Sequence, residues 1–219
     1  MDGVSRFWEF ISERPEEIWA LTLEHAYLVL SAIAVASVLA VALGVLAHRR
    51  PVLRGPFLGV AGVFLTIPSF ALFALFIPVV GLGDRPAQIA LVMYSILPIL
   101  RNTVTGLNGV DRAVVESAKG MGLSAPQRLL RVELPLAWPV ILAGMRVATL
   151  LATGIAAIAT LVGGGGLGEY IKEGLTRYPL PTSVERIWTG TLFTVLLALV
   201  LDLVYSLVHR FTTSEGHSR

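Results

Sequence analysis

The sequence predicts an all-α, polytopic membrane protein with about five transmembrane helices. Hydrophobic residues make up 55% of the 219-residue chain and charged residues only 15%, whereas a soluble domain carries about 25% charged residues. The mean hydropathy is +0.75, in the direction expected for a membrane protein. Five apolar segments are each long enough to cross a bilayer, which takes about 20 residues. Most of the chain is therefore needed for the spans.

The chain divides into an external N-terminal segment, a transmembrane domain over 26–208 and a cytoplasmic tail over 209–219. In the N-terminal segment, 1–25, aromatic and acidic residues are mixed, which favours an amphipathic stretch on the outer membrane interface; a frayed tail is the alternative. The expected spans are 26–47, 57–80, 87–107, 136–162 and 187–208. Residues 108–135 form the loop between the third and fourth spans.

The placement of lysine and arginine sets the orientation of the spans. The membrane face that receives the loop 108–135 carries ten of the 17 cations. The opposite face carries six cations together with ten acids. The cation-rich face is therefore cytoplasmic, so that the N-terminus lies outside and the C-terminus inside.

Small residues and prolines within the spans predict how the helices pack. Two stripes at i+4 spacing allow close approach of helices, within the chain or between chains. The stripes are Ala32, Ala36, Ala40 and Gly44, and Gly144, Ala148, Ala152 and Ala156. Three prolines, Pro68, Pro78 and Pro98, interrupt spans and predict kinks whose freed carbonyls need other partners.

Two ionisable residues fall inside spans, Arg146 in the fourth and Asp202 in the fifth. Charged groups at this depth are costly and usually face protein or water. Both lie toward the cytoplasmic side, so they form a candidate intramembrane pair; separate snorkelling to the inner interface is the alternative. A proton relay needs more acids at depth than this chain has, which argues against an ion-coupled carrier.

A glycine-rich run follows the fourth span at its outer end. Gly163, Gly165 and Gly168 match G-x-G-x-x-G, but no strand precedes them and the outer face offers no nucleotide, so dinucleotide binding is not expected. The preferred interpretation is a flexible, close-packed turn. It is a candidate external gate. The gate residues are Gly164, Gly165, Gly166 and Gly168.

Other chemistries are not expected. The chain has no G-x-x-x-x-G-K-[ST] phosphate loop, so it cannot hydrolyse ATP by that route, and we assign no catalytic residue. It has no cysteine, and its four histidines form no spaced pair, so no metal site is predicted. A net charge of +2 is too small to suggest nucleic-acid binding. Residues 1–19 lack the apolar core of a signal peptide.

The loop 108–135 is polar but has internal helical signals. Asp111 is a candidate cap for a first helix, which the glycines at 120 and 122 end. Ser124 is a candidate cap for a second helix with Pro126 in its first turn, and Pro135 predicts a break before the fourth span. Two short helices around a glycine turn are suited to docking into a groove of a soluble partner. A merely solvated connection is the alternative.

This loop resembles the EAA loop of ABC importer permeases. The family pattern is Glu-Ala-Ala, three residues, Gly, nine residues, Ile, one residue and Leu-Pro, and every spacing matches, with Ser117 and Val132 replacing Ala and Ile. The resemblance implies a type I ABC importer (MetI-like) permease fold and a loop that couples to the ATPase. The residues of this ATPase-coupling loop are Glu116, Ser117, Ala118, Gly120, Met121, Gly122, Leu123, Val132, Leu134 and Pro135.

Finer features are similar to the osmoprotectant branch of that family. They are Ile67-Pro68-Ser69, the segments 97–103, 132–137 and 143–146, and the glycine run 164–168. The resemblance implies a permease subunit of an ATP-driven importer for glycine betaine, carnitine or choline in the cell membrane. The alternatives are another small solute, such as an amino acid or an oxyanion, an ATP-independent carrier, or a membrane scaffold.

The resemblance also implies partners. They are two cytoplasmic ABC ATPase subunits that bind ATP and magnesium, a second permease subunit, identical or a sister chain, and an external substrate-binding protein. The chain itself is expected to hold no cofactor, and recognition of the solute is expected on the binding protein rather than in a tight transmembrane site.

Overall fold

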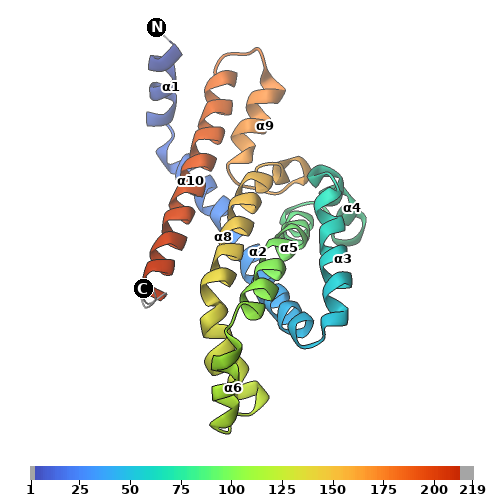
Figure 1. Ribbon diagram of the computed structural model, residues 1–219. Coiled ribbons are helices and arrows are strands. Elements are labelled where there is room, and N and C mark those ends of the chain that lie inside the picture. Colours follow the sequence, from blue (N-terminus) through green and yellow to red (C-terminus); the bar gives the residue numbers. More distant parts are fainter. Residues whose placement is uncertain (1–2, 213–219) are drawn as a thin grey trace.

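The computed structural model describes residues 3–212 and is helical, with no strand in that range (Figure 1). The predicted all-α class is confirmed. Four helices are long and apolar enough to cross a membrane: α2 (Pro15–Arg49), α5 (Asp84–Asn108), α8 (Leu134–Ala156) with the turns that lead into it, and α10 (Ser183–Thr212). α3 (Arg54–Thr66) and α4 (Ser69–Val80) together make up a fifth crossing or a re-entrant loop.

The N-terminal segment differs from the one expected. It is split by Pro15, which begins α2 and fits there because the first turn of a helix needs no amide hydrogen from it. The helix of the first span therefore begins well before residue 26. The preceding helix, α1 (Gly3–Ser12), stands beside α10 (Figure 1), and its Phe10 is buried against Tyr170, with ring centroids 6.0 Å apart. This segment therefore packs on protein through Phe10.

The second expected span, 57–80, is not a single straight helix. α3 and α4 meet at a bend of 99°. Ile67 is extended, because a following proline disfavours the helical conformation, and Pro68 then leads into α4. The Ile67 carbonyl that this break frees accepts a hydrogen bond from the Tyr94 hydroxyl on α5, at 2.5 Å. Pro78 and Pro98, in contrast, lie inside α4 and α5 without ending them.

The core is centred on α5, which packs between α2 and α8. Both predicted stripes of small residues are buried in these contacts within the chain. A Cβ built on Gly44 would lie 2.5 Å from Thr103 Cγ2, and one on Gly144 would lie 2.6 Å from Asn102 Cβ. Small residues at these positions are therefore required for the three helices to approach so closely.

The region around the fourth span holds three further differences. No break occurs at Pro135: a π-helical turn, Leu129–Glu133, joins α7 (Ala125–Arg128) to α8, and the Leu134 amide donates to the Leu129 carbonyl. Pro135 is tolerated in the first turn of α8. At its other end α8 stops at Ala156 rather than 162, and a 3-10 turn, Ala159–Val162, leads into the glycine run and α9 (Gly168–Arg177).

The last described element is α10, which continues through Thr212 and so includes the first four residues of the expected tail, 209–219. The rest of that tail, 213–219, lies outside the described residues. In Figure 1 the helix α6 (Arg112–Gly120) occupies one end of the molecule, whereas α1 and α9 lie at the other. The positive-inside rule assigns the α6 end to the cytoplasm and the α9 end to the outside.

Candidate functional site

The loop at the inner end begins with α6, whose two ends are closed by local hydrogen bonds. At its start, the Ala113 amide donates to Asp111 Oδ1 at 2.8 Å, so the predicted cap is present. At its end, the Leu123 amide donates to the Ala118 carbonyl at 3.2 Å and the Gly122 amide to the Lys119 carbonyl at 2.9 Å. This pattern is a Schellman motif, which needs a left-handed residue. Gly122 provides it, with φ of 82°.

The second helix of the loop, α7, is only four residues long and is also closed locally. Ser124 and Gln127 form a capping box, in which the Ser124 amide donates to Gln127 Oε1 at 2.8 Å. The predicted arrangement of two helices around a glycine turn is thus present. Because α7 runs through the π-helical turn into α8, the loop is continuous with the fourth span.

The predicted coupling residues divide into buried and exposed sets. Ala118 is only 1% exposed and seats α6 on the protein, whereas Met121 is 73% exposed. Leu130, in the π-helical turn that follows α7, is 65% exposed. The Glu116 carboxylate lies 3.8 Å from Lys119 Nζ, and both side chains are largely exposed. The loop therefore presents apolar and charged side chains outward from a fixed backbone.

Side chains of α2 and of α7 itself hold this loop in place. Arg49 Nη2 donates to the Ala125 carbonyl at 3.2 Å, and Arg128 Nη1 donates to the Leu123 carbonyl at 3.0 Å. His48 lies 2.8 Å from Asn108 Oδ1 through Nδ1 and 3.5 Å from Glu133 Oε2 through Nε2. These residues line a cleft of about 660 Å³ between the loop and the spans. Sequence reasoning assigned Arg49 only to the cation count, because its partner is 76 residues away.

The two intramembrane charges are brought together. Arg146 Nε donates to Asp202 Oδ1 at 2.5 Å and Arg146 Nη2 to Asp202 Oδ2 at 2.6 Å, a bidentate fork between α8 and α10. One turn further along α8, Thr149 Oγ1 donates to the Tyr205 hydroxyl at 2.9 Å. Most of the apolar length of α10 is exposed in the chain, but Leu197 and Leu201 are buried in the core, so the polar contacts add to apolar packing.

The glycine run at the outer end is buried at all four candidate gate positions. The Gly165 amide donates to Asp84 Oδ1 and the Gly166 amide to Glu24 Oε2, each at 3.1 Å. A Cβ on Gly168 would lie 2.0 Å from the Ala157 carbonyl oxygen. The run is close-packed, as expected, and two of its amides bind carboxylates of the same chain rather than facing an open phosphate site.

Acidic residues dominate the surroundings of this run. Burial raises the pKa of Glu169, and the neighbouring carboxylates of Glu24 and Glu173 raise it further. The pKa of Tyr170 is also raised, first by burial and then by Glu17. Arg186 is hydrogen-bonded to Glu173 and Lys172 Nζ donates to the Thr160 carbonyl at 2.8 Å, so both of these cations have partners.

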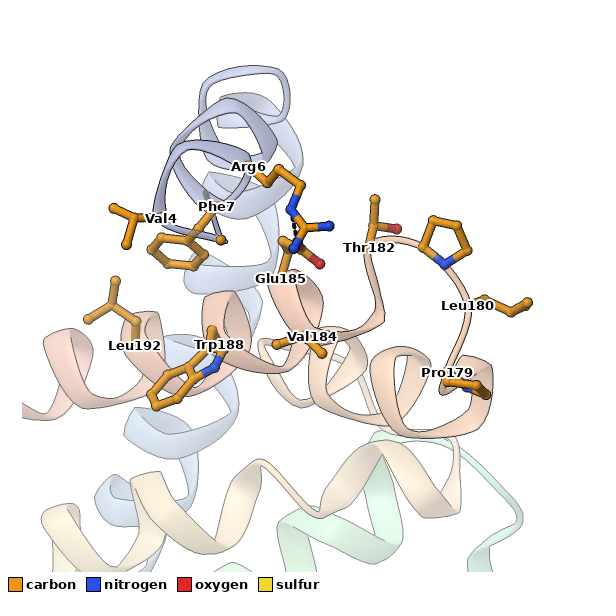
Figure 2. A pocket seen from close by; sticks show the side chains of 12 residues that line it. Val4, Arg6, Phe7, Pro179, Leu180, Thr182, Val184, Glu185, Trp188 and Leu192 are labelled. Carbon is orange, nitrogen blue, oxygen red and sulfur yellow. Dashed lines mark ion pairs between the residues drawn. The ribbon is translucent and has the colours of Figure 1, made fainter. Parts of the chain in front are cut away.

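A separate groove of about 600 Å³ lies between α1 and the start of α10 (Figure 2). Its walls are mainly apolar, with Phe7, Trp188 and Leu192 around it, and it holds one ion pair, between Arg6 Nε and Glu185 Oε1 at 3.7 Å. None of the predicted site residues lines this groove.

A comparison with known protein families agrees with the arrangement of the loop and spans. The sequence profile of the family described as binding-protein-dependent transport system inner membrane component matches residues 29–214. The match includes the coupling loop, the glycine run and most of the helices.

Several characterised proteins are similar over nearly their whole lengths. The choline transport system permease protein OpuBB of Bacillus subtilis is 41% identical over 211 residues, which are 96% of this chain and 95% of that protein. The glycine betaine/carnitine/choline transport system permease protein OpuCB of the same organism is 39% identical over 213 residues, 97% of this chain and 96% of that one. The osmoprotectant import permease protein OsmW of Salmonella typhimurium is 41% identical over 202 residues, 90% of this chain and 92% of that one.

Among solved structures, the fold is similar to a chain of the MetNI methionine ABC transporter in an inward-facing conformation. The TM-score is 0.76 and the identity 21%, over 90% of this chain and 96% of that chain. At this identity the likeness bears on the fold, and it agrees with the type I importer architecture expected from the loop.

Proposed function

We propose a cargo and a coupling mechanism for this chain, which belongs to the family of binding-protein-dependent transport system inner membrane components. The chain is a multi-pass permease subunit of an ABC importer in the cell membrane. Transport systems of this family depend on a binding protein.

The proposed cargo is a small osmoprotectant with a quaternary ammonium group, such as choline, glycine betaine or carnitine. These are the compounds in the names of the similar permeases, and 41% identity over 96% of the chain supports the extension. The cargo is selected by the external binding protein, so that this chain provides a path rather than a tight site.

The proposed coupling element is the loop 108–135. The single observation that carries this is that α6 and α7 form a locally closed unit, exposed on one side at Met121 and Leu130 and held on the other by Arg49. Closure of two ATP- and magnesium-binding subunits would push on the exposed side. Because α7 continues into α8, the push reaches the fourth span directly and opens the pathway by rigid-body rocking.

In this proposal a second permease subunit completes the pathway.

Within this chain, two further elements have a part in the motion. The fork between Arg146 and Asp202 keeps α10 moving with α8, since it is made at two points and resists rotation of either helix. The buried glycine run at the other end of the same span acts as the external gate.

The coupling mechanism is tested by docking of the ATPase. Gly122→Trp places a large side chain at a left-handed position on the loop surface and is expected to abolish co-purification of the ATPase and ATP-driven uptake in proteoliposomes. Gly55→Trp is the matched control, because Gly55 is exposed on the same membrane face with nothing within 4 Å of its Cβ position. Uptake by the wild-type complex that persists without ATP would contradict the importer mechanism.

The cargo is tested by competition. Cells that express the complete importer should take up radiolabelled choline or glycine betaine, and unlabelled carnitine should compete. An amino acid or an oxyanion should not compete. If methionine or molybdate competes while the quaternary ammonium compounds do not, the proposed cargo is wrong although the coupling mechanism stands.

A further inference from the structure

Two carboxylates from different helices hold the outer glycine run. Glu24 on α2 accepts from the Gly166 amide, and Asp84 in the first turn of α5 accepts from the Gly165 amide. Next to them, the Gly83 amide donates to the Val162 carbonyl at 3.0 Å. The segment between α8 and α9 is thus fastened to the outer part of α2 and the outer end of α5, the two helices that pack with α8 in the core.

The adjacent residue of α2 fastens α8 itself. His25 Nε2 lies 3.0 Å from the Thr153 carbonyl, in the last turns of α8, and the imidazole is fully buried. Its ring is close to the backbone of Gly166, since a Cβ built there would lie 3.0 Å from His25 Nδ1. Glu24 therefore binds the glycine run at a point where α2 is already fixed against α8.

The burial of the two partners differs in a way that suits a reversible contact. The glycine amides lie in a buried run, whereas Glu24 and Asp84 are exposed residues. When the run moves away, the carboxylates remain hydrated, and the amides gain water in place of the carboxylates. The contact therefore holds the closed arrangement without leaving a buried charge unpaired when it opens.

We propose that Glu24 and Asp84 are positioning residues of an outer latch, which keeps the external gate closed until the spans rock apart. This inference rests on the proposed transport function and adds to it the groups that hold the gate. The two amide–carboxylate contacts fasten α2 and α5 to the segment after α8, so outward opening must break them. Neither carboxylate contacts the cargo in this role.

Gly165 offers a way to open the latch without removing either carboxylate. A Cβ at this position would lie 2.1 Å from Glu24 Oε1, which is the far end of a flexible side chain. The φ of Gly165 is not positive, so alanine is compatible with the backbone. Gly165→Ala should therefore displace the Glu24 carboxylate from the Gly166 amide while leaving the fold in place.

The test measures access to the space beneath the run. The chain has no cysteine, so Ala159→Cys supplies a single reporter. Ala159 is fully buried, and its Cβ would lie 3.1 Å from one built on Gly164. The complex with its ATPases, in proteoliposomes without nucleotide, is labelled from outside with a membrane-impermeant maleimide, and ATP-driven uptake is measured on the same preparation.

All variants are made in the Ala159→Cys protein, which is the parent for comparison. The double variant Glu24→Ala/Asp84→Ala should label about tenfold faster than this parent, because two charge-assisted hydrogen bonds no longer favour the closed gate. Gly165→Ala should also label faster. Glu24→Gln/Asp84→Asn keeps an acceptor oxygen at each site and should lie between the double alanine variant and the parent. Glu16→Ala, which removes an exposed acid earlier on α2, should label at the parent rate.

The latch is wrong if the double alanine variant and Gly165→Ala both label at the parent rate, or if Glu16→Ala accelerates labelling as much as they do. Should the double variant fail to assemble with its ATPases, Gly165→Ala decides the question alone. The labelling needs no cargo, so it separates the two proposals: absent ATP-driven uptake in the parent contradicts the transport function, whereas normal uptake with unchanged labelling contradicts only the latch.

Discussion

The inner and outer ends of the molecule are held together by different kinds of contact. At the inner end, each closing hydrogen bond of α6 and α7 joins residues at most five positions apart, as between Asp111 and Ala113 or Ala118 and Leu123. At the outer end, the glycine run is held by Asp84 and Glu24, which are 81 and 142 positions away in sequence. The caps of α6 and α7 can form locally, and the contact from Arg49 to the Ala125 carbonyl is added when α2 packs beside them, whereas both carboxylate contacts of the outer run depend on the packed spans.

This difference matches what an importer requires of its two ends. A loop that receives a push from a partner should keep its shape, and local caps keep the shape of α6 and α7. A gate should come apart when the helices beneath it separate, and contacts made between distant segments do so. The comparison predicts that outer substitutions act through packing between spans, whereas substitutions at the caps of the inner loop act through the shape of the loop.

The largest expected effect is from Gly168→Ala at the outer end. The new Cβ would lie 2.0 Å from the Ala157 carbonyl oxygen, a backbone atom that cannot move without shifting the end of α8. We expect a loss of about 3 kcal/mol or more of stability, seen as failure to accumulate in membranes or loss of the assembled complex in detergent.

The matched control is Gly154→Ala, also near the outer end of α8, where nothing lies within 4 Å of the Cβ position. It should be neutral, or stabilising by up to about 1 kcal/mol through helix propensity. Normal accumulation of Gly168→Ala would show that the run is loosely held and would remove the contrast between the two ends.

The second-largest effect is expected from substitutions in the ion pair between Arg146 on α8 and Asp202 on α10. Arg146→Leu leaves the Asp202 carboxylate without its partner inside a span, and Asp202→Leu does the same to the guanidinium. Each single variant should lower the temperature at which α10 separates from α8 in the purified complex. This temperature is measured by introducing a cysteine on the packed side of α10 and following its protection from a thiol reagent. The double variant Arg146→Leu/Asp202→Leu, which removes both charges, should be less impaired than either single variant.

Additive losses in this cycle would contradict the fork as a coupled pair. The two side chains would then act separately, as in the alternative of snorkelling to the inner interface. If the double variant is instead less impaired than the sum of the single variants, the fork acts as a coupled pair. It then resembles the outer contacts, which also form only after the spans have packed.

The contrast between local and long-range contacts also explains how far the sequence could predict this structure. The caps at Asp111 and Ser124 and the turn at Gly122 are short-range patterns, and the structure has all of them. The small-residue stripes pack as expected, because a glycine such as Gly44 allows a neighbouring helix to approach closely whichever residue faces it.

The features that the sequence could not predict depend on residues far away in the same chain, or on local conformations of similar energy. Glu24 and Asp84 were only two of ten outer acids, and nothing near them in sequence indicates the amides they bind. Pro135 carries the signal for a helix break, but a π-helical turn accommodates it. Pro68 carries the same signal, and there the chain does break, with the freed Ile67 carbonyl accepting a hydrogen bond from the Tyr94 hydroxyl.

A third, smaller effect is expected at the inner end. Gly122→Ala forces a side chain into a left-handed conformation, and Ser124→Ala removes a capping box; each should cost about 1 kcal/mol and loosen only the loop. Hydrogen exchange of the α6 and α7 amides should accelerate, while that of α2 and α5 stays unchanged. Faster exchange at α2 and α5 would mean that the loop is not an independent unit.

The smallest effect concerns the acidic outer end and depends on pH. Burial, followed by Glu24 and Glu173, raises the pKa of Glu169 above its ordinary value, so the carboxylate is disfavoured in the folded chain. The contribution of this group to stability is present below the ordinary pKa and is lost as pH rises through the raised one. Glu169→Gln should therefore match the parent protein near pH 4 and exceed its stability at neutral pH by only about 0.3 kcal/mol, because the residue is only partly buried and its interactions are screened by solvent. Chemical denaturation of both complexes across this range measures the difference, and an advantage for the variant that grows toward acid pH would reverse the sign and contradict the account.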